Sequence, residues 1–180
     1  MYSLLGISGS LRAEATNRKL LREAARLFDA SDYTEANLNL PLYNTDLETA
    51  KGIPASVISL ANEIEKANAV IISTPEYNKG PSGVLKNALD WVSRTSQQTW
   101  RDKPVAIMSA SAGRAGGERA QFVLRGFMVP FRPRILQGPE VHLANSNQQF
   151  DEKGHLISNV YLDSLQELMN DLRQEVERSI

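Results

Sequence analysis

The sequence predicts an α/β fold in which a five-stranded parallel sheet, of strand order 2-1-3-4-5, carries helices on both faces. Short apolar runs alternate with amphipathic helical patterns along the whole chain. The run at residues 69–73, Ala-Val-Ile-Ile-Ser, is β-branched and lacks alternation, which is typical of a strand buried on both faces of a parallel sheet. Right-handed crossovers through the helices would join such strands.

The first half of the chain supplies two strands and two helices before that central run. Residues 2–7 form a short apolar run, and the apolar stripe of residues 20–28 predicts a helix. Residues 31–40 indicate a weak second strand, and residues 41–46 a loop. Residues 54–67 predict the next helix, with a proline suited to its first turn.

The second half supplies a helix, a polar connection, a strand, a helix, an interrupted strand and a last helix. Their predicted ranges are 83–93, 97–104, 105–109, 120–128, 134–136 resuming at 141–143, and 161–176. The last helix has one apolar face and a charged opposite side, so we interpret it as an ordinary packing helix.

Length and composition limit the function. The chain has 180 residues, 20 basic and 21 acidic side chains and no cysteine, and we expect one domain over residues 1–180. A net charge of -1 argues against a nucleic-acid binder, and the lack of cysteine excludes disulfides, cysteine nucleophiles and cysteine-ligated metals. There is no membrane-spanning apolar stretch or signal-peptide pattern, so we expect a cytoplasmic protein.

The loop after the first strand has the features of an anion site. It precedes a helix, whose free N–H groups and dipole favour negative charge. Neutral hydrogen-bond donors could come from Ser10, Thr16 and Asn17. A charged guanidinium group could come from Arg12. The alternative is that Thr16 or Asn17 only caps the helix. Neither G-x-G-x-x-G nor Gly-Lys-Ser/Thr occurs here, which favours a monophosphate over a dinucleotide or ATP.

Two further loops follow the third and fourth strands. Residues 74–78, Thr-Pro-Glu-Tyr-Asn, offer a restricted backbone, an aromatic face and polar groups, and Asn78-Lys79-Gly80 could turn peptide groups toward a ligand. Residues 110–117 contain three glycines and Ser111, which would let the backbone approach a flat ligand. The alternatives are an ordinary βα turn and a flexible connector.

These loops are expected to converge. In a doubly wound sheet, strands one and three flank the switch point, where such folds bind ligands. A phosphate site at one end and a flat wall at the other suit a phosphate attached to a planar ring system, namely FMN.

Three motifs in this order resemble the NADPH-dependent FMN reductase family, the flavodoxin-like group of quinone, chromate and azo-dye reductases. They are Gly-Ser-Leu-Arg at 9–12 with Thr16-Asn17, Pro-Glu-Tyr-Asn at 75–78, and Gly-Val-Leu-Lys-Asn-Ala-Leu-Asp-Trp at 83–91. A looser match covers 103–109 and the Gly-rich loop. The resemblance spans most of the chain and implies a three-layer flavodoxin-like fold.

The resemblance also implies roles for individual residues. Ser10, Arg12, Thr16 and Asn17 would hold the FMN phosphate. Pro75, Glu76, Tyr77 and Asn78 would border the isoalloxazine, largely through backbone groups, and Ser111 and Gly113 would line its other edge. In this family the helix at 83–91 packs on a partner subunit, which implies a homodimer or homotetramer.

Other polar and aromatic residues suggest structure rather than chemistry. Lys86 and Asp90 are spaced to pair on a helix surface, and we interpret Trp91 as a core or interface residue. His142 and His155 have no partner at metal-binding spacing. The lack of a side-chain acid, base or nucleophile suits flavin chemistry, in which the cofactor carries the hydride.

The resulting hypothesis is an oxidoreductase that takes hydride from NADPH or NADH onto bound FMN. It would then reduce a quinone, azo compound, metal oxyanion or free flavin by a ping-pong mechanism. The alternatives are a flavodoxin-type electron carrier, against which the near-neutral charge argues, and a nucleotide-binding regulatory module of the same fold.

Overall fold

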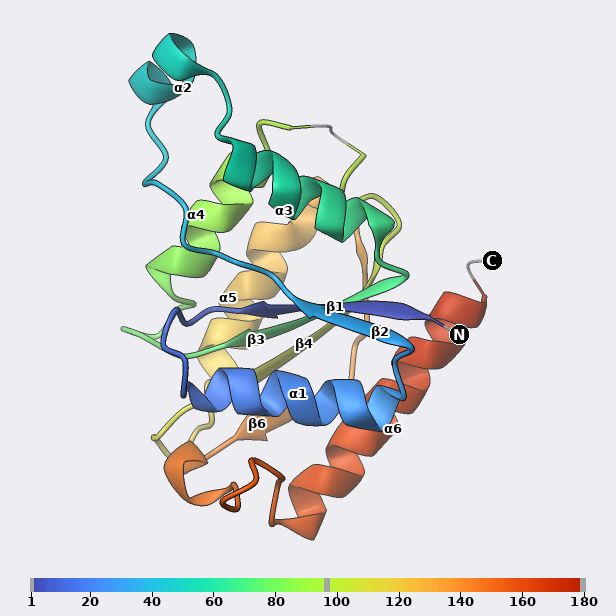
Figure 1. The fold of residues 1–180 in the computed structure, drawn as a ribbon. Helices are drawn as coiled ribbons and strands as arrows, with labels where there is room; N and C mark the ends of the chain where they lie inside the picture. The colour runs from blue at the N-terminus through green and yellow to red at the C-terminus, as the bar shows by residue number, and fades with distance from the viewer. Residues whose placement is uncertain (1, 96–97, 179–180) are drawn as a thin grey trace.

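The computed structural model describes residues 2–95 and 98–178, and its sheet confirms the predicted fold class (Figure 1). Every strand pair is parallel, in the order β2-β1-β3-β4-β5, with β6 also paired to β4. The predicted fifth strand is therefore present in two pieces along one edge of β4. The strands are β1 (Ser3–Ser8), β2 (Asp32–Glu35), β3 (Ala69–Thr74), β4 (Pro104–Ala110), β5 (Arg134–Ile135) and β6 (Val141–Leu143).

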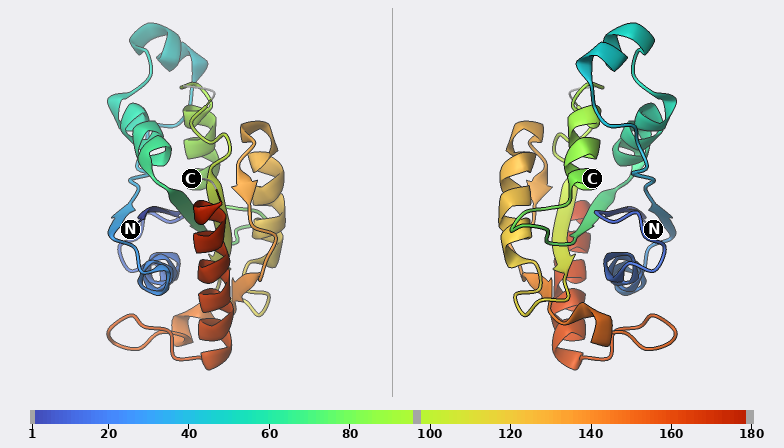
Figure 2. Two further views of the ribbon diagram at one scale, coloured as in Figure 1. Left: turned by 90° about the vertical axis from the view of Figure 1, so that its right-hand side faces the viewer. Right: turned by 90° about the vertical axis from the view of Figure 1, so that its left-hand side faces the viewer.

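Helices cover both faces of this sheet, as Figure 2 shows from the two ends. The helices α1 and α6 pack on one face, while α3, α4 and α5 pack on the other. Their bounds are α1 (Thr16–Phe28), α2 (Thr45–Lys51), α3 (Ala55–Lys66), α4 (Gly83–Val92), α5 (Glu118–Met128) and α6 (Asn159–Glu177), with short 3-10 turns η1 (Val129–Phe131) and η2 (Ser146–Gln148). Among the described residues, no helix is long and apolar enough to cross a membrane.

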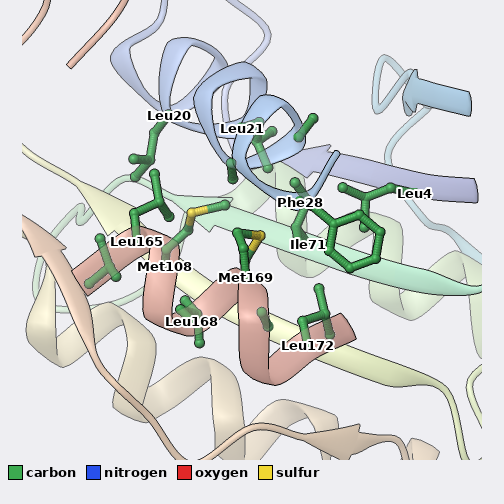
Figure 3. Close-up of a cluster of buried hydrophobic side chains, with 14 of the residues drawn as sticks. Leu4, Leu20, Leu21, Phe28, Ile71, Met108, Leu165, Leu168, Met169 and Leu172 are labelled. Atoms are coloured by element: carbon green, nitrogen blue, oxygen red, sulfur yellow. The ribbon is translucent and has the colours of Figure 1, made fainter. Parts of the chain in front are cut away.

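Each layer has its own apolar core. Figure 3 shows the core under α1 and α6, where side chains of both helices meet side chains of β1, β3 and β4. Both faces of β3 and β4 are completely buried, as their unbroken apolar runs predict. The last helix packs through the predicted face, with Leu165, Leu168, Met169, Leu172 and Val176 buried.

Three local predictions were wrong. Thr45 and Asp46, at the end of the predicted loop of residues 41–46, begin the helix α2, because the Asn44 side chain accepts a hydrogen bond from the Asp46 amide and caps it. Pro54 precedes the first turn of α3 instead of lying in it. In the predicted polar connection, Gln97 lies outside the described residues, but Trp100 is 2 % exposed and packs in the core beside α4 and α5.

The helix α2 lies apart from the body of the molecule, at the top of Figure 1. None of its residues is buried. The segment before it is attached to α4 through Trp91, whose indole N–H donates to the Pro41 carbonyl at 2.7 Å and whose ring meets Tyr43 edge-on. Trp91 is 0 % exposed, so its interpretation as a core residue is confirmed.

Candidate functional site

The carboxyl ends of β1, β3 and β4 bring three loops together, as predicted, at the left-hand end of the sheet in Figure 1. The pairing register aligns Ser8 with Ser73 and Thr74 with Ser109, so the strands end side by side. The loops that leave them, residues 9–15, 75–82 and 111–117, form the candidate site.

The first two loops are in direct contact at Gly9. Its N–H donates to the Ser73 carbonyl at 2.8 Å. A Cβ at this position would lie 2.9 Å from Pro75 Cδ and 3.1 Å from Ser82 Oγ. A side chain would therefore push the two loops apart, and only glycine permits this approach.

The start of α1 is open to an anion. Neither Thr16 nor Asn17 caps the helix: its N-cap is Ala15, which offers no side-chain acceptor. Among the hydrogen bonds of residues 2–95 and 98–178, none satisfies the backbone N–H of Thr16 or Asn17. The exposed Arg12 side chain has no hydrogen-bond or ion-pair partner in that part of the chain, and the first turn of α1 holds no acidic residue. Unpaired N–H groups, a helix dipole and a free guanidinium are the chemistry that holds a phosphate.

The Asn17 side chain also has a structural role that its position in the sequence does not indicate. It is 3 % exposed, and its amide oxygen accepts from Ser73 Oγ at 2.7 Å and from the Ala110 N–H at 3.0 Å. Its amide nitrogen donates to the Ala110 carbonyl at 2.9 Å. Asn17 thus ties α1 to the ends of both β3 and β4, beneath the candidate site.

Sequence reasoning missed Ser146, the first residue of η2. Its hydroxyl lies 3.0 Å from the Thr16 hydroxyl, and its N–H donates to the Ser111 carbonyl at 3.0 Å. Ser146 is 2 % exposed, and its two contacts connect the start of α1 with the Gly-rich loop. Nothing in the local sequence signals this contact, because it spans 130 positions.

Residues 77–80 form a tight turn that projects beyond the strands at the left of Figure 1. Tyr77 and Gly80 exchange two backbone hydrogen bonds, of 2.9 and 3.0 Å. The central residues Asn78 and Lys79 have φ values of 50° and 66°, which define a type I′ turn. The left-handed conformation therefore falls on these two residues rather than on Gly80. The Tyr77 side chain is 59 % exposed and free to cover a flat ligand.

The half-buried Glu76 side chain reaches α5. Its Oε2 accepts a hydrogen bond from the Ala120 N–H at 3.2 Å. Glu76, which we expect to border a flavin ring, thus also joins the loop after β3 to α5, the helix that follows the Gly-rich loop.

The Gly-rich loop is folded back on β4 and β6. At Gly116, with a φ of 62°, a Cβ would lie 2.3 Å from the His142 carbonyl oxygen. At Gly117, with a φ of 94°, it would lie 2.7 Å from Ser109 Cβ. Ser109 Oγ donates to the Gly116 carbonyl at 2.7 Å. The glycines are thus required for a fixed shape, and Ser111 and Gly113 lie on the open side of the loop.

The two histidines belong to no potential metal-binding cluster within the described part of the chain, where no group of three or more His, Asp or Glu residues could hold a metal ion. His155 Nδ1 lies 3.1 Å from Oε2 of Glu23, a nearly buried residue of α1. Burial opposes ionisation of Glu23, but hydrogen bonds from Arg26 and His155 outweigh it and lower the pKa of this carboxyl. The contact attaches the segment after η2 to α1, behind the candidate site.

A groove of about 690 Å³ lies elsewhere. It runs between α4 and α5 and includes none of the residues of the three loops. Lys86 and Asp90 line it and form the predicted ion pair, at 2.7 Å. The candidate site itself lies at the carboxyl ends of β1, β3 and β4, where much of the three loops is exposed.

Comparison with known proteins agrees with this geometry. The model of a family described as NADPH-dependent FMN reductase matches residues 2–148. An NAD(P)H-dependent FMN reductase of Pseudomonas aeruginosa is 40% identical over 177 residues, which covers 97% of this chain and 95% of the relative. A quinone reductase of Escherichia coli is 37% identical over 161 residues, with coverages of 87% and 86%.

A solved structure shows the same fold. The flavoenzyme NAD(P)H:(acceptor) oxidoreductase FerB of Paracoccus denitrificans superposes with a TM-score of 0.88 at 28% identity, over 99% of this chain and 98% of that one. The family match covers most of the chain, and both curated relatives exceed 35% identity over most of their length. The chain therefore belongs to the NADPH-dependent FMN reductase family of oxidoreductases.

Proposed function

We propose that this protein holds FMN on the three loops and uses it to pass electrons from NADPH or NADH to a small-molecule acceptor. One observation carries the proposal. The first turn of α1 offers unpaired N–H groups and a free Arg12 beside an open surface that two further loops border. A phosphate would bind at the first turn of α1, and a flat ring attached to it would lie on the surface that the other two loops border.

The residues present fit this group. Ser10, Arg12 and the N–H groups of Thr16 and Asn17 would hold the phosphate. Residues 75–78 would border the ring on one side, through backbone groups and the exposed Tyr77 ring. Ser111 and Gly113 would line the other edge. The close approach of Gly9 to Pro75 would bring the phosphate and ring subsites side by side.

When bound, FMN would supply the hydride chemistry, accepting two electrons from NAD(P)H and releasing them to the acceptor. The chain's own part is to orient the ring and leave one face open. Among the three loops, Tyr77 is the one aromatic residue, so these loops supply no pair of aromatic rings to enclose the flavin. NAD(P)H and the acceptor would then occupy the same face in turn, which produces ping-pong kinetics.

The acceptor would be a quinone, by analogy with the relatives named quinone reductase, or an azo compound, a metal oxyanion or a free flavin. The alternative function is that of a flavodoxin-type electron carrier. A carrier docks on protein partners by charge, whereas this chain has a net charge of -1. The enzyme is therefore the better-supported proposal.

We also propose that residues 1–180 act as one domain and assemble into a homodimer or homotetramer in the cytoplasm. The single sheet and its two cores support the first part. The half-exposed Lys86–Asp90 pair and the groove beside it leave one side of α4 available to a partner subunit.

Steady-state turnover tests the function. We expect the FMN-loaded protein to consume NADPH or NADH continuously when a water-soluble benzoquinone is present, with parallel lines in double-reciprocal plots at several quinone concentrations. Intersecting lines would contradict the shared face. Bound flavin without sustained NAD(P)H consumption would favour the electron carrier.

A further inference from the structure

We infer that Glu76 is a positioning residue that fixes the spacing between the two loops bordering the flavin ring. The inference rests on the proposed function and concerns a side chain whose structural contact is with α5. Its carboxylate accepts the hydrogen bond from the Ala120 N–H at 3.2 Å. Ala120 is the third residue of α5, and the loop that enters this helix is the Gly-rich loop.

The helix α5 cannot cap its own N-terminus at this N–H. The N-cap residue is Gly117, whose φ of 94° is a conformation that other residues rarely adopt, and it has no side chain. Ala120 is 0 % exposed, so its N–H would be shielded from water as well. A buried N–H without an acceptor destabilises the fold. Glu76 supplies the acceptor, although it belongs to a different loop.

The same bond anchors the projecting turn. The two backbone hydrogen bonds between Tyr77 and Gly80 hold the turn together but do not attach it to its surroundings. Across residues 2–95 and 98–178, the Glu76–Ala120 bond is the one hydrogen bond that joins residues 75–80 to the segment after β4. A carboxylate near the positive end of a helix dipole also makes this bond favourable.

The distance between the ring borders therefore depends on the length of the Glu76 side chain. The bond needs an acceptor at the position of Oε2, which a glutamine amide oxygen can occupy. An aspartate keeps the charge but is one methylene shorter, so its oxygens would not reach Ala120 without a shift of the loop. Glutamine and aspartate thus separate the reach of the side chain from its charge.

The test compares the flavin affinities of four variants with that of the wild type. FMN and riboflavin are titrated into the apoprotein and followed by flavin fluorescence. We expect Glu76→Ala and Glu76→Asp to weaken both flavins about fivefold to tenfold, since the loss equals that of a helix cap. Glu76→Gln is expected to stay within about twofold of the wild type, because it restores the bond. The control Glu118→Gln removes an exposed carboxylate from the same helix end and should change nothing.

Two readouts separate positioning from general destabilisation. Riboflavin lacks the phosphate, so the ratio of the two flavin affinities should remain at its wild-type value in every Glu76 variant. Hydrogen exchange of the Ala120 amide should accelerate in Glu76→Ala and Glu76→Asp but not in Glu76→Gln. If Glu76→Ala fails to fold, the Gln and Asp variants still test the idea.

Several outcomes would overturn the inference. Tight flavin binding by Glu76→Asp together with weak binding by Glu76→Gln would mean that the charge matters and the reach does not. Wild-type affinity in all variants, despite faster exchange at Ala120, would mean that the bond has no effect on the ring subsite. A wild-type protein that binds neither flavin would instead contradict the proposed function, whatever the exchange data show.

Discussion

Replacing Arg12 with alanine is expected to weaken FMN binding about 10- to 100-fold while leaving riboflavin affinity unchanged. Charge-assisted hydrogen bonds contribute about 1.5–3 kcal/mol each, which corresponds to that range of affinity. The Arg12 side chain is exposed and has no partner within the described part of the chain. Its removal should therefore change the stability of the fold little and weaken only the contacts with the FMN phosphate.

The matched control for Arg12 is Arg178→Ala. Arg178 is an exposed arginine directly after α6, and this helix ends at the opposite end of the sheet from the three loops (Figure 1). We expect its loss to change FMN affinity less than about threefold, as a distant surface charge would. Fluorescence titration of both variants with FMN and riboflavin measures the effect. Equal losses in the two variants, or an equal loss for riboflavin, would remove Arg12 from the phosphate site.

Replacing Asn17 with leucine is expected to lower the free energy of unfolding by about 3 kcal/mol, because it leaves several buried polar groups without partners. The Ser73 hydroxyl and the N–H and carbonyl of Ala110 would all lose their bonds to this side chain. Since these groups lie at the ends of β3 and β4, the loops above them should also lose their arrangement, and FMN affinity should fall with stability.

Chemical denaturation of the apoprotein and FMN titration measure the two effects of Asn17→Leu separately. The control is Asn62→Ala, at an exposed position of α3, for which we expect a change within about 0.5 kcal/mol. Unchanged stability in Asn17→Leu would show that the strand ends do not depend on this side chain. Lost stability with wild-type FMN affinity would show that the loops do not depend on the strand ends.

Much of the fold follows from local patterns. The unbroken apolar run of β3 and the periodic faces of α1, α4 and α6 depend on near neighbours, and each lies where the sequence predicts it. The helix α2 escaped prediction because it buries nothing and has no apolar stripe; only the Asn44 cap marks its start.

The convergence of the three loops could be predicted from the sequence, but the hydrogen bonds that join them could not. The convergence of three loops follows from the order of strands in a doubly wound sheet. The roles of Asn17, Ser146 and Glu76 depend instead on hydrogen bonds across 93, 130 and 44 positions. Such contacts exist only once the sheet has placed the loops, so composition and spacing do not reveal them. The sequence likewise does not show that Asn78 and Lys79, rather than Gly80, take the left-handed conformation.

The most direct test of the proposed function is an anaerobic absorbance spectrum. The purified protein is loaded with FMN, freed of excess flavin and mixed with NADPH, and then separately with NADH. We expect the visible bands of bound flavin to bleach with at least one of the two nucleotides, which would establish the cofactor and its reduction in one experiment. A protein that retains no FMN, or bound FMN whose bands persist with both nucleotides, would contradict the proposal.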